Sequence, residues 1–125
     1  MPEQARTRRI SIVDDDASIR AALRSLMRSV QIEAEAFGSA EEFLASGRAA
    51  ETDCLILDLY LPGMNGFELQ ARLRAEQRAI PIIFITAHAD DVTREQALKA
   101  GAVEFLSKPV RREPLFKAIQ TALSR

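Results

Sequence analysis

Short apolar segments rich in β-branched residues alternate along the chain with longer amphipathic segments. The apolar segments lie at Ile10–Val13, Ile32–Phe37, Leu55–Leu57, Ile82–Ile85 and Val103–Leu106. Two stretches, CLIL at 54–57 and IIFI at 82–85, are apolar at every position, which is typical of strands covered on both faces. The pattern therefore predicts five strands, of which the central ones are buried between layers of helix.

The segment between the first two strands has the spacing of an amphipathic helix. Its polar side carries Arg20, Arg24 and Arg28. Its apolar side consists of Ile19, Ala22, Leu23, Leu26, Met27 and Val30. This helix is expected to cover one face of the sheet with its apolar side.

Four further helices follow from local signals. SAEE at 39–42 predicts a capping box in which Ser39 and Glu42 open a short second helix. The fourth helix is expected to stop before Gly101, and the last helix tolerates Pro114 in its first turn. The apolar positions of the third to fifth helices are Phe67, Leu69 and Leu73; Val92, Ala97 and Leu98; and Leu115, Phe116, Ile119, Ala122 and Leu123.

Strands that alternate with helices through short connections predict βαβ units, and hence an α/β fold with a parallel, doubly wound sheet. In such sheets the functional site lies beyond the carboxyl ends of the strands. Chemically active residues stand at four of these ends: Asp14 and Asp15, Asp58, Thr86 and Lys108. We therefore expect them to meet at one edge of the sheet.

Carboxylates gathered at one edge repel each other or recruit a cation, since unit charges about 4 Å apart interact by about 4 kcal/mol at an effective dielectric of about 20. Oxygen ligands without histidine or cysteine favour Mg²⁺ or Mn²⁺ over zinc. Lys108 and Thr86 can contact phosphoryl oxygens, and Asp58 can accept a phosphoryl group. A single Asp at a strand end is more often a cap or turn residue, and Asp16 is expected to cap the first helix.

Composition narrows the classes of function. The length of 125 residues predicts one domain, 9–125, after a flexible N-terminus at 1–8. The net charge of −1 argues against broad electrostatic binding to nucleic acid. Cys54 is the only cysteine, which favours a reducing, cytoplasmic compartment, and no segment resembles a signal peptide or a membrane span. His88 is the only histidine, so a multi-histidine metal cluster is excluded. A Cys54–His88 catalytic dyad is disfavoured because Cys54 leads into a buried strand.

Four segments together resemble the receiver domain of two-component response regulators. They are IVDDD at 12–16, LDLYLPGMNG at 57–66, IFITAH at 83–88 and GAVEFLSKP at 101–109. The resemblance extends from Arg9 to the last helix, and two of the segments are similar to FixJ-type transcriptional regulators in particular. It implies a flavodoxin-like (βα)5 fold with strand order 2-1-3-4-5.

The resemblance also implies a chemistry. Asp58 would accept a phosphoryl group from the phosphohistidine of a sensor histidine kinase. Mg²⁺ would be held by Asp15, Asp58 and the main-chain carbonyl of Tyr60, with Asp14 acting through water. The protein would then be a signalling switch that catalyses its own phosphorylation and slow dephosphorylation, rather than a conventional enzyme.

Thr86 and Lys108 would bind phosphoryl oxygens, and Phe105 would reposition when Thr86 moves. The Lys108–Pro109 peptide is expected to be cis. Phosphorylation would promote a homodimer through the face formed by the fourth helix, the fifth strand and the fifth helix. DNA would be contacted only through a possible C-terminal domain, and the sequence does not determine whether one follows residue 125, nor the kinase or the target genes.

Several alternatives stay open. The rings of Tyr60 and His88 either prolong the phosphorylated state by hindering water or are ordinary loop side chains. The three arginines of the first helix form either a solvated face or a docking surface for the kinase. A phosphohydrolase with an aspartyl-phosphate intermediate would need a carboxylate at position 60, and a degenerate receiver would not need the complete acidic, threonine and lysine set.

Overall fold

Five parallel strands form a single sheet in the order β2-β1-β3-β4-β5. The computed structural model describes residues 8–124. The strands are β1 (Arg9–Val13), β2 (Glu33–Phe37), β3 (Cys54–Asp58), β4 (Ile82–Thr86) and β5 (Glu104–Ser107). The predicted fold and strand order are confirmed, whereas the flexible N-terminus predicted for 1–8 lies, except for Arg8, outside the described residues.

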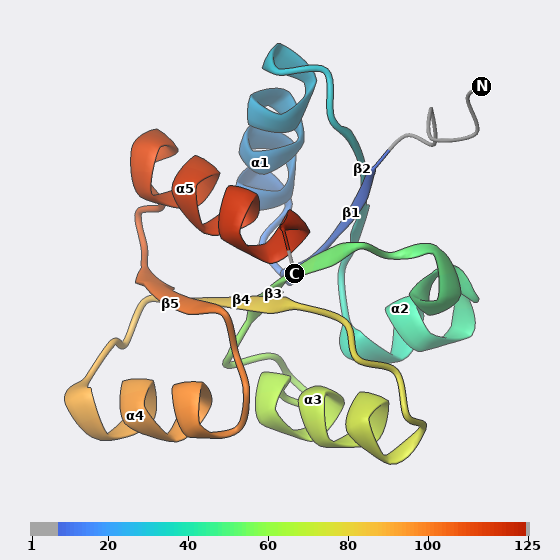
Figure 1. Cartoon of the computed structure of the whole chain (residues 1–125), viewed down its shortest axis with the longest axis vertical. Helices are drawn as coiled ribbons and strands as arrows, with labels where there is room; N and C mark the ends of the chain where they lie inside the picture. Colours follow the sequence, from blue (N-terminus) through green and yellow to red (C-terminus); the bar gives the residue numbers. More distant parts are fainter. Residues whose placement is uncertain (1–7, 125) are drawn as a thin grey trace.

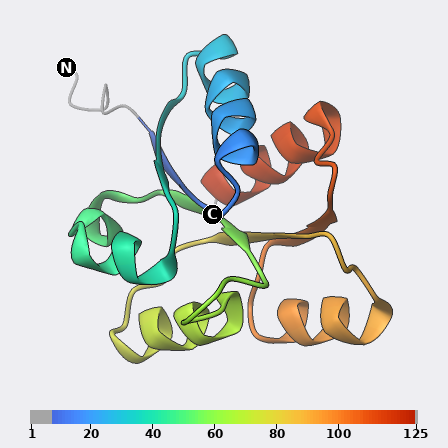
Figure 2. The same ribbon diagram turned by 180° about the vertical axis from the view of Figure 1, so that it is seen from behind.

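Helices cover both faces of the sheet (Figure 1). They are α1 (Ala17–Ser29), α2 (Ala40–Ala45), α3 (Gly66–Ala75), α4 (Asp91–Lys99) and α5 (Arg112–Leu123), with a short 3-10 helix, η2 (Arg48–Glu51), that the sequence did not predict. The view from behind shows the same division, with α1 and α5 on one side and α2, α3 and α4 on the other (Figure 2). No helix within residues 8–124 has the length and apolar character needed to cross a lipid bilayer.

The core has two parts because the central strands are buried on both faces. All five residues of β3 and all five of β4 are buried. On one face, Leu23 and Met27 of α1 pack with residues of α5 such as Leu115. On the other, Phe43 of α2 and Leu69 of α3 pack against alternate strand residues. The continuous apolar runs therefore have the double coverage that the pattern predicted.

Two details of the helices differ from the sequence pattern. Val92 and Leu98, apolar positions that mark the fourth helix, are 76% and 37% exposed, and Ala97 is the buried residue of α4. The Ser39 hydroxyl caps α2 by accepting from the Glu42 amide at 3.0 Å, but the Glu42 carboxylate accepts from Gly38 rather than completing the box. The complete capping box opens α3 instead, between Asn65 and Glu68.

Candidate functional site

The register of the strands places the predicted site residues together at the carboxyl edge of the sheet. Val13 pairs with Leu57, so Asp14 and Asp58 follow adjacent positions of neighbouring strands. Asp58 pairs with Ile85, one residue before Thr86. Because all strands are parallel, their carboxyl ends share one edge of the sheet, and the expected grouping is present there.

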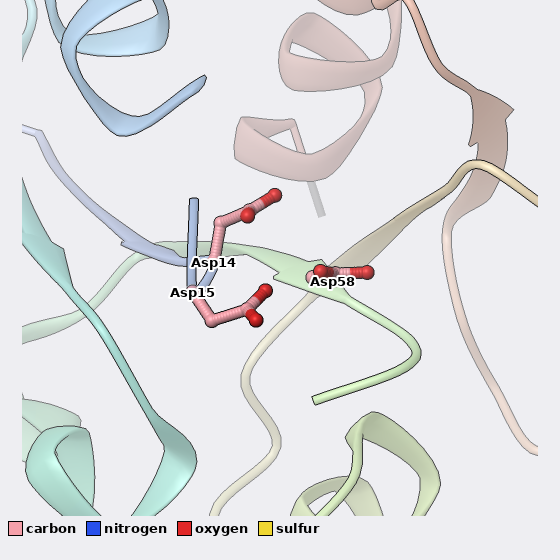
Figure 3. Close-up of side chains that lie close together, drawn as sticks. All are labelled: Asp14, Asp15 and Asp58. Atoms are coloured by element: carbon pink, nitrogen blue, oxygen red, sulfur yellow. The ribbon is translucent and has the colours of Figure 1, made fainter. Parts of the chain in front are cut away.

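Three carboxylates converge at this edge. One oxygen from each of Asp14, Asp15 and Asp58 lies within 4.8 Å of the others. Figure 3 shows the first two at the end of β1 and the third at the end of β3. Asp14 and Asp58 are buried and Asp15 is exposed, so the cluster is open to solvent on the side of Asp15.

The third acidic residue of the β1–α1 loop is structural. The Asp16 carboxylate accepts hydrogen bonds from the amides of Ser18 and Ile19 at 2.8 and 3.3 Å, which confirms its predicted role as the cap of α1. The amide of Asp16 in turn donates to Asp14 Oδ1 at 2.9 Å. Of the three consecutive aspartates, two therefore face the site and one orders the loop.

Lys108 neutralises part of the acidic charge. Its ammonium lies 2.9 Å from Asp14 Oδ2 and 3.3 Å from Asp58 Oδ2. Burial alone would lower the pKa of Lys108, but its contacts with Asp14 and Asp58 raise the pKa overall, so the side chain is a firmly protonated cation. The Lys108–Pro109 peptide is cis, as predicted.

Asp58 is held in an environment that resists its ionisation. Burial is the largest cause of its raised pKa, and the negative charge of Asp14 is the second. Lys108 and the amide of Tyr60, which donates to Asp58 Oδ1 at 3.3 Å, oppose this shift. A bound cation would relieve the remaining repulsion.

The donor set fits a hard divalent cation. Asp14 Oδ2 is buried and accepts no well-aligned hydrogen bond from the described residues, although the Lys108 ammonium is close to it. All the clustered ligand atoms are carboxylate oxygens, without histidine or cysteine, which suits Mg²⁺ better than zinc. The residues present therefore fit a magnesium ion.

Thr86 ends β4, and Tyr60 and His88 follow the carboxyl ends of β3 and β4. The buried Thr86 hydroxyl accepts a hydrogen bond from the His88 amide at 3.0 Å, which leaves its proton free to donate. The rings of Tyr60 and His88 meet edge to face with centroids 5.8 Å apart. Phe105 is buried. Its repositioning with Thr86 stays a prediction.

Three supporting residues were missed by the sequence analysis. Arg20, assigned to a polar helix face, donates to the main-chain carbonyl of Asp14 at 2.7 Å. Glu41 accepts from the amide of Met64 at 2.8 Å and so ties α2 to the loop after β3. That hydrogen bond is the main reason why the pKa of Glu41 is lowered. Gly66 lies against the main chain of Asp58. Glu41 and Met64 are 23 residues apart, so no local motif signals their hydrogen bond.

Cys54 takes no part in the site. It lies at the start of β3, where it pairs with Ile10, whereas His88 follows the carboxyl end of β4. Burial, with a smaller contribution from the charge of Asp53, raises the pKa of the Cys54 thiol to about 12. A Cys54–His88 dyad is therefore excluded by position and by protonation state.

Comparisons with known proteins agree with this geometry. The sequence profile of the response regulator receiver domain matches residues 10–120. Nodulation protein W of Bradyrhizobium diazoefficiens is 47% identical over 116 residues, which cover 93% of this chain and 51% of that protein. The transcriptional regulatory protein FixJ of the same organism is 35% identical over 114 residues, which cover 91% of this chain and 56% of that protein. The solved structure of the response regulator StyR matches with a TM-score of 0.87 and 45% identity, covering 95% of this chain and 60% of that one. The chain thus spans about half the length of the curated relatives it matches.

Proposed function

The chain belongs to the response regulator receiver domain family, and from this premise we propose that it accepts a phosphoryl group on Asp58 from a sensor histidine kinase. It is the receiver domain of a two-component response regulator. The observation that carries the proposal is the position of the Lys108 ammonium, 2.9 Å from Asp14 and 3.3 Å from Asp58. Asp58 would be the nucleophile, Lys108 is the cation, and Asp14 and Asp58 together would bind the metal.

Asp15, Asp58 and the Tyr60 carbonyl would hold Mg²⁺, and Asp14 would act through water. When bound, Mg²⁺ would stabilise the negative charge on the transferred phosphoryl oxygens. Asp14 and Asp15 remain unphosphorylated in this scheme, because their role is to bind the cation. The Tyr60 amide donates to Asp58 Oδ1, and the Lys108 ammonium donates to Asp58 Oδ2.

The reaction is an in-line displacement at phosphorus. An Asp58 oxygen forms the new P–O bond while the P–N bond of phosphohistidine breaks, and the imidazole leaves with that electron pair. The Lys108 ammonium and the Thr86 hydroxyl stabilise the equatorial oxygens. In hydrolysis, water attacks phosphorus, the Asp58–phosphate bond breaks, and the carboxylate and inorganic phosphate are released.

Intact-mass measurement after incubation with Mg²⁺ and a small phosphodonor tests the proposal. We expect the addition of one phosphoryl group to the wild type, none with Asp58→Asn, and none when Mg²⁺ is chelated. Asp91→Asn is the matched control, because Asp91 is an exposed carboxylate in the first turn of α4. Equal labelling of Asp58→Asn and wild type would refute the assignment of Asp58.

A turnover phosphohydrolase is the second function considered. It would require an acid–base carboxylate two residues after the nucleophile, where this chain has the half-exposed Tyr60. A degenerate receiver is disfavoured by the complete set of acidic residues, Thr86 and Lys108. We therefore propose a signalling switch that catalyses only its own modification and its slow reversal.

The switch is proposed to act through α4, β5 and α5. Arg94 of α4 donates to the main-chain carbonyl of Phe105 at 3.1 Å and pairs with Glu104 at 3.4 Å, which connects the helix to the strand. Val92 on α4 is 76% exposed and offers an apolar contact. These contacts support the proposal that phosphorylation promotes a symmetric pair through this face, with any DNA binding left to another domain.

Tyr60 and His88 are proposed to lengthen the phosphorylated state. Their rings contact each other, and Tyr60 and His88 stand two residues past Asp58 and Thr86. Water must approach phosphorus from the side opposite the aspartyl oxygen, and bulky rings at the entrance obstruct that approach.

A further inference from the structure

Arg20 reaches from the first helix back to the end of β1. Its backbone amide donates to the carbonyl of Asp16 at 3.0 Å, so the residue lies in the first turn of α1. Its guanidinium donates from Nη1 to the main-chain carbonyl of Asp14 at 2.7 Å. The side chain is therefore partly buried and directed toward the acidic loop rather than extended into solvent.

Gly38, just after β2, leaves room for this arrangement. A Cβ at position 38 would lie 3.4 Å from Arg20 Nη1 and 3.9 Å from its Cζ. Any longer side chain there would compete with the guanidinium for the same space. The contact between Arg20 and Asp14 thus depends on three segments, namely the end of β1, the first turn of α1 and the residues following β2.

The contact fixes the peptide that joins the two acidic residues. The Asp14 amide donates to Phe37 at 3.1 Å, and its Oδ1 accepts from Asp16 at 2.9 Å. Within residues 8–124, no protein group hydrogen-bonds the exposed Asp15 carboxylate. The backbone sets the direction of the Asp15 Cα–Cβ bond, and the carbonyl held by Arg20 is one end of the Asp14–Asp15 peptide.

We propose that Arg20 is a positioning residue for magnesium: it orients the Asp14–Asp15 peptide so that both carboxylates face the metal. This inference rests on the proposed function, because it assumes that Mg²⁺ binds at the cluster. Electrostatics alone predicts the opposite sign. Removing a nearby cation would strengthen the attraction of the acidic cluster for Mg²⁺. The direction of the change in affinity therefore separates positioning from simple charge.

The test is a calorimetric Mg²⁺ titration of the wild type, Arg20→Met, Arg20→Lys and Arg24→Met. Loss of groups that orient metal ligands typically weakens binding by about 10–100-fold, so we expect Arg20→Met to raise the Kd about tenfold. Arg20→Lys keeps the charge but not the planar guanidinium, and a rise of about threefold is expected. Arg24→Met, one turn further along the same helix, should stay within about twofold of wild type.

A second readout separates positioning from kinase docking and from a general loss of structure. Labelling by a small phosphodonor, without kinase, should need more Mg²⁺ in Arg20→Met but approach the wild-type rate at saturation. Urea unfolding without Mg²⁺ shows whether each variant is folded. If Arg20→Met is unfolded, the Mg²⁺ affinity of Arg20→Lys is compared with that of wild type instead. Wild type that binds no Mg²⁺ would refute the proposed function, whereas folded Arg20 variants that bind as tightly as wild type would overturn this inference alone.

Discussion

Replacing Gly66 with alanine should destabilise the protein, although glycine-to-alanine changes in helices usually stabilise. Gly66 is the first residue of α3, directly after its capping residue Asn65. A Cβ there would lie 2.8 Å from the carbonyl oxygen of Asp58 and 2.9 Å from Leu59 Cα. Both neighbours are backbone atoms of the buried β3 end, so they cannot move aside as a flexible side chain would.

The magnitude follows from two opposing contributions. Alanine reduces the entropy of the unfolded chain and so stabilises by about 0.4–1 kcal/mol. Inserting a methyl group where the packing has no room costs about 1–3 kcal/mol. The net expectation is a loss of about 1–2 kcal/mol in the free energy of unfolding.

Urea unfolding followed by circular dichroism measures this loss. With a slope of about 2 kcal/mol per M, the midpoint should fall by about 0.5–1 M. Gly38→Ala is the matched control. The atoms nearest to its Cβ would be the end of the Arg20 side chain, at 3.4 Å, and the Glu42 carboxylate, at 3.6 Å, so its stability should stay within about 0.5 kcal/mol of wild type. Equal or greater stability of Gly66→Ala relative to wild type would refute the packing argument.

Four further predictions concern the site. Without Mg²⁺, Asp58→Asn should be more stable than wild type at neutral pH. The folded-state pKa of Asp58 is raised, chiefly by burial and then by Asp14, so its ionised form destabilises the fold. The extra stability of Asp58→Asn should therefore disappear as the pH falls through that pKa. Equal urea midpoints of the variant and the wild type at all pH values would contradict this. Mg²⁺ at about 100 times its Kd should stabilise wild type by about 2.7 kcal/mol, and thermal unfolding of Asp15→Asn should show a much smaller effect. The double variant Tyr60→Asn, His88→Glu should lose its phosphoryl group several-fold faster in a mass-spectrometric time course, and an unchanged rate would leave the rings as ordinary loop side chains. A phosphoryl analogue should raise the sedimentation coefficient at high protein concentration, and Val92→Glu should suppress that rise without affecting labelling of Asp58.

The sequence alone was sufficient for the fold and for the position of the acidic cluster. Apolar runs such as those of β3 and β4 have few solutions other than strands covered on both faces. Once the strands are parallel, their carboxyl ends share an edge, and the strand order that the family resemblance implies brings Asp14, Asp58 and Lys108 close together there. The Asp16 cap was also predictable, because its partners are two and three residues away.

Only the tertiary structure decided which polar side chains support the site. Helical periodicity placed Arg20 on a polar face, but periodicity does not distinguish a solvated guanidinium from one that contacts the carbonyl of Asp14. Glu41 and Met64 are 23 residues apart, and their hydrogen bond depends on how α2 packs beside the loop after β3. Val92 carries the apolar character of a core residue, yet α4 buries Ala97 instead. Contacts between neighbours in sequence are governed by local geometry, whereas these depend on how separate elements pack, which local patterns do not encode.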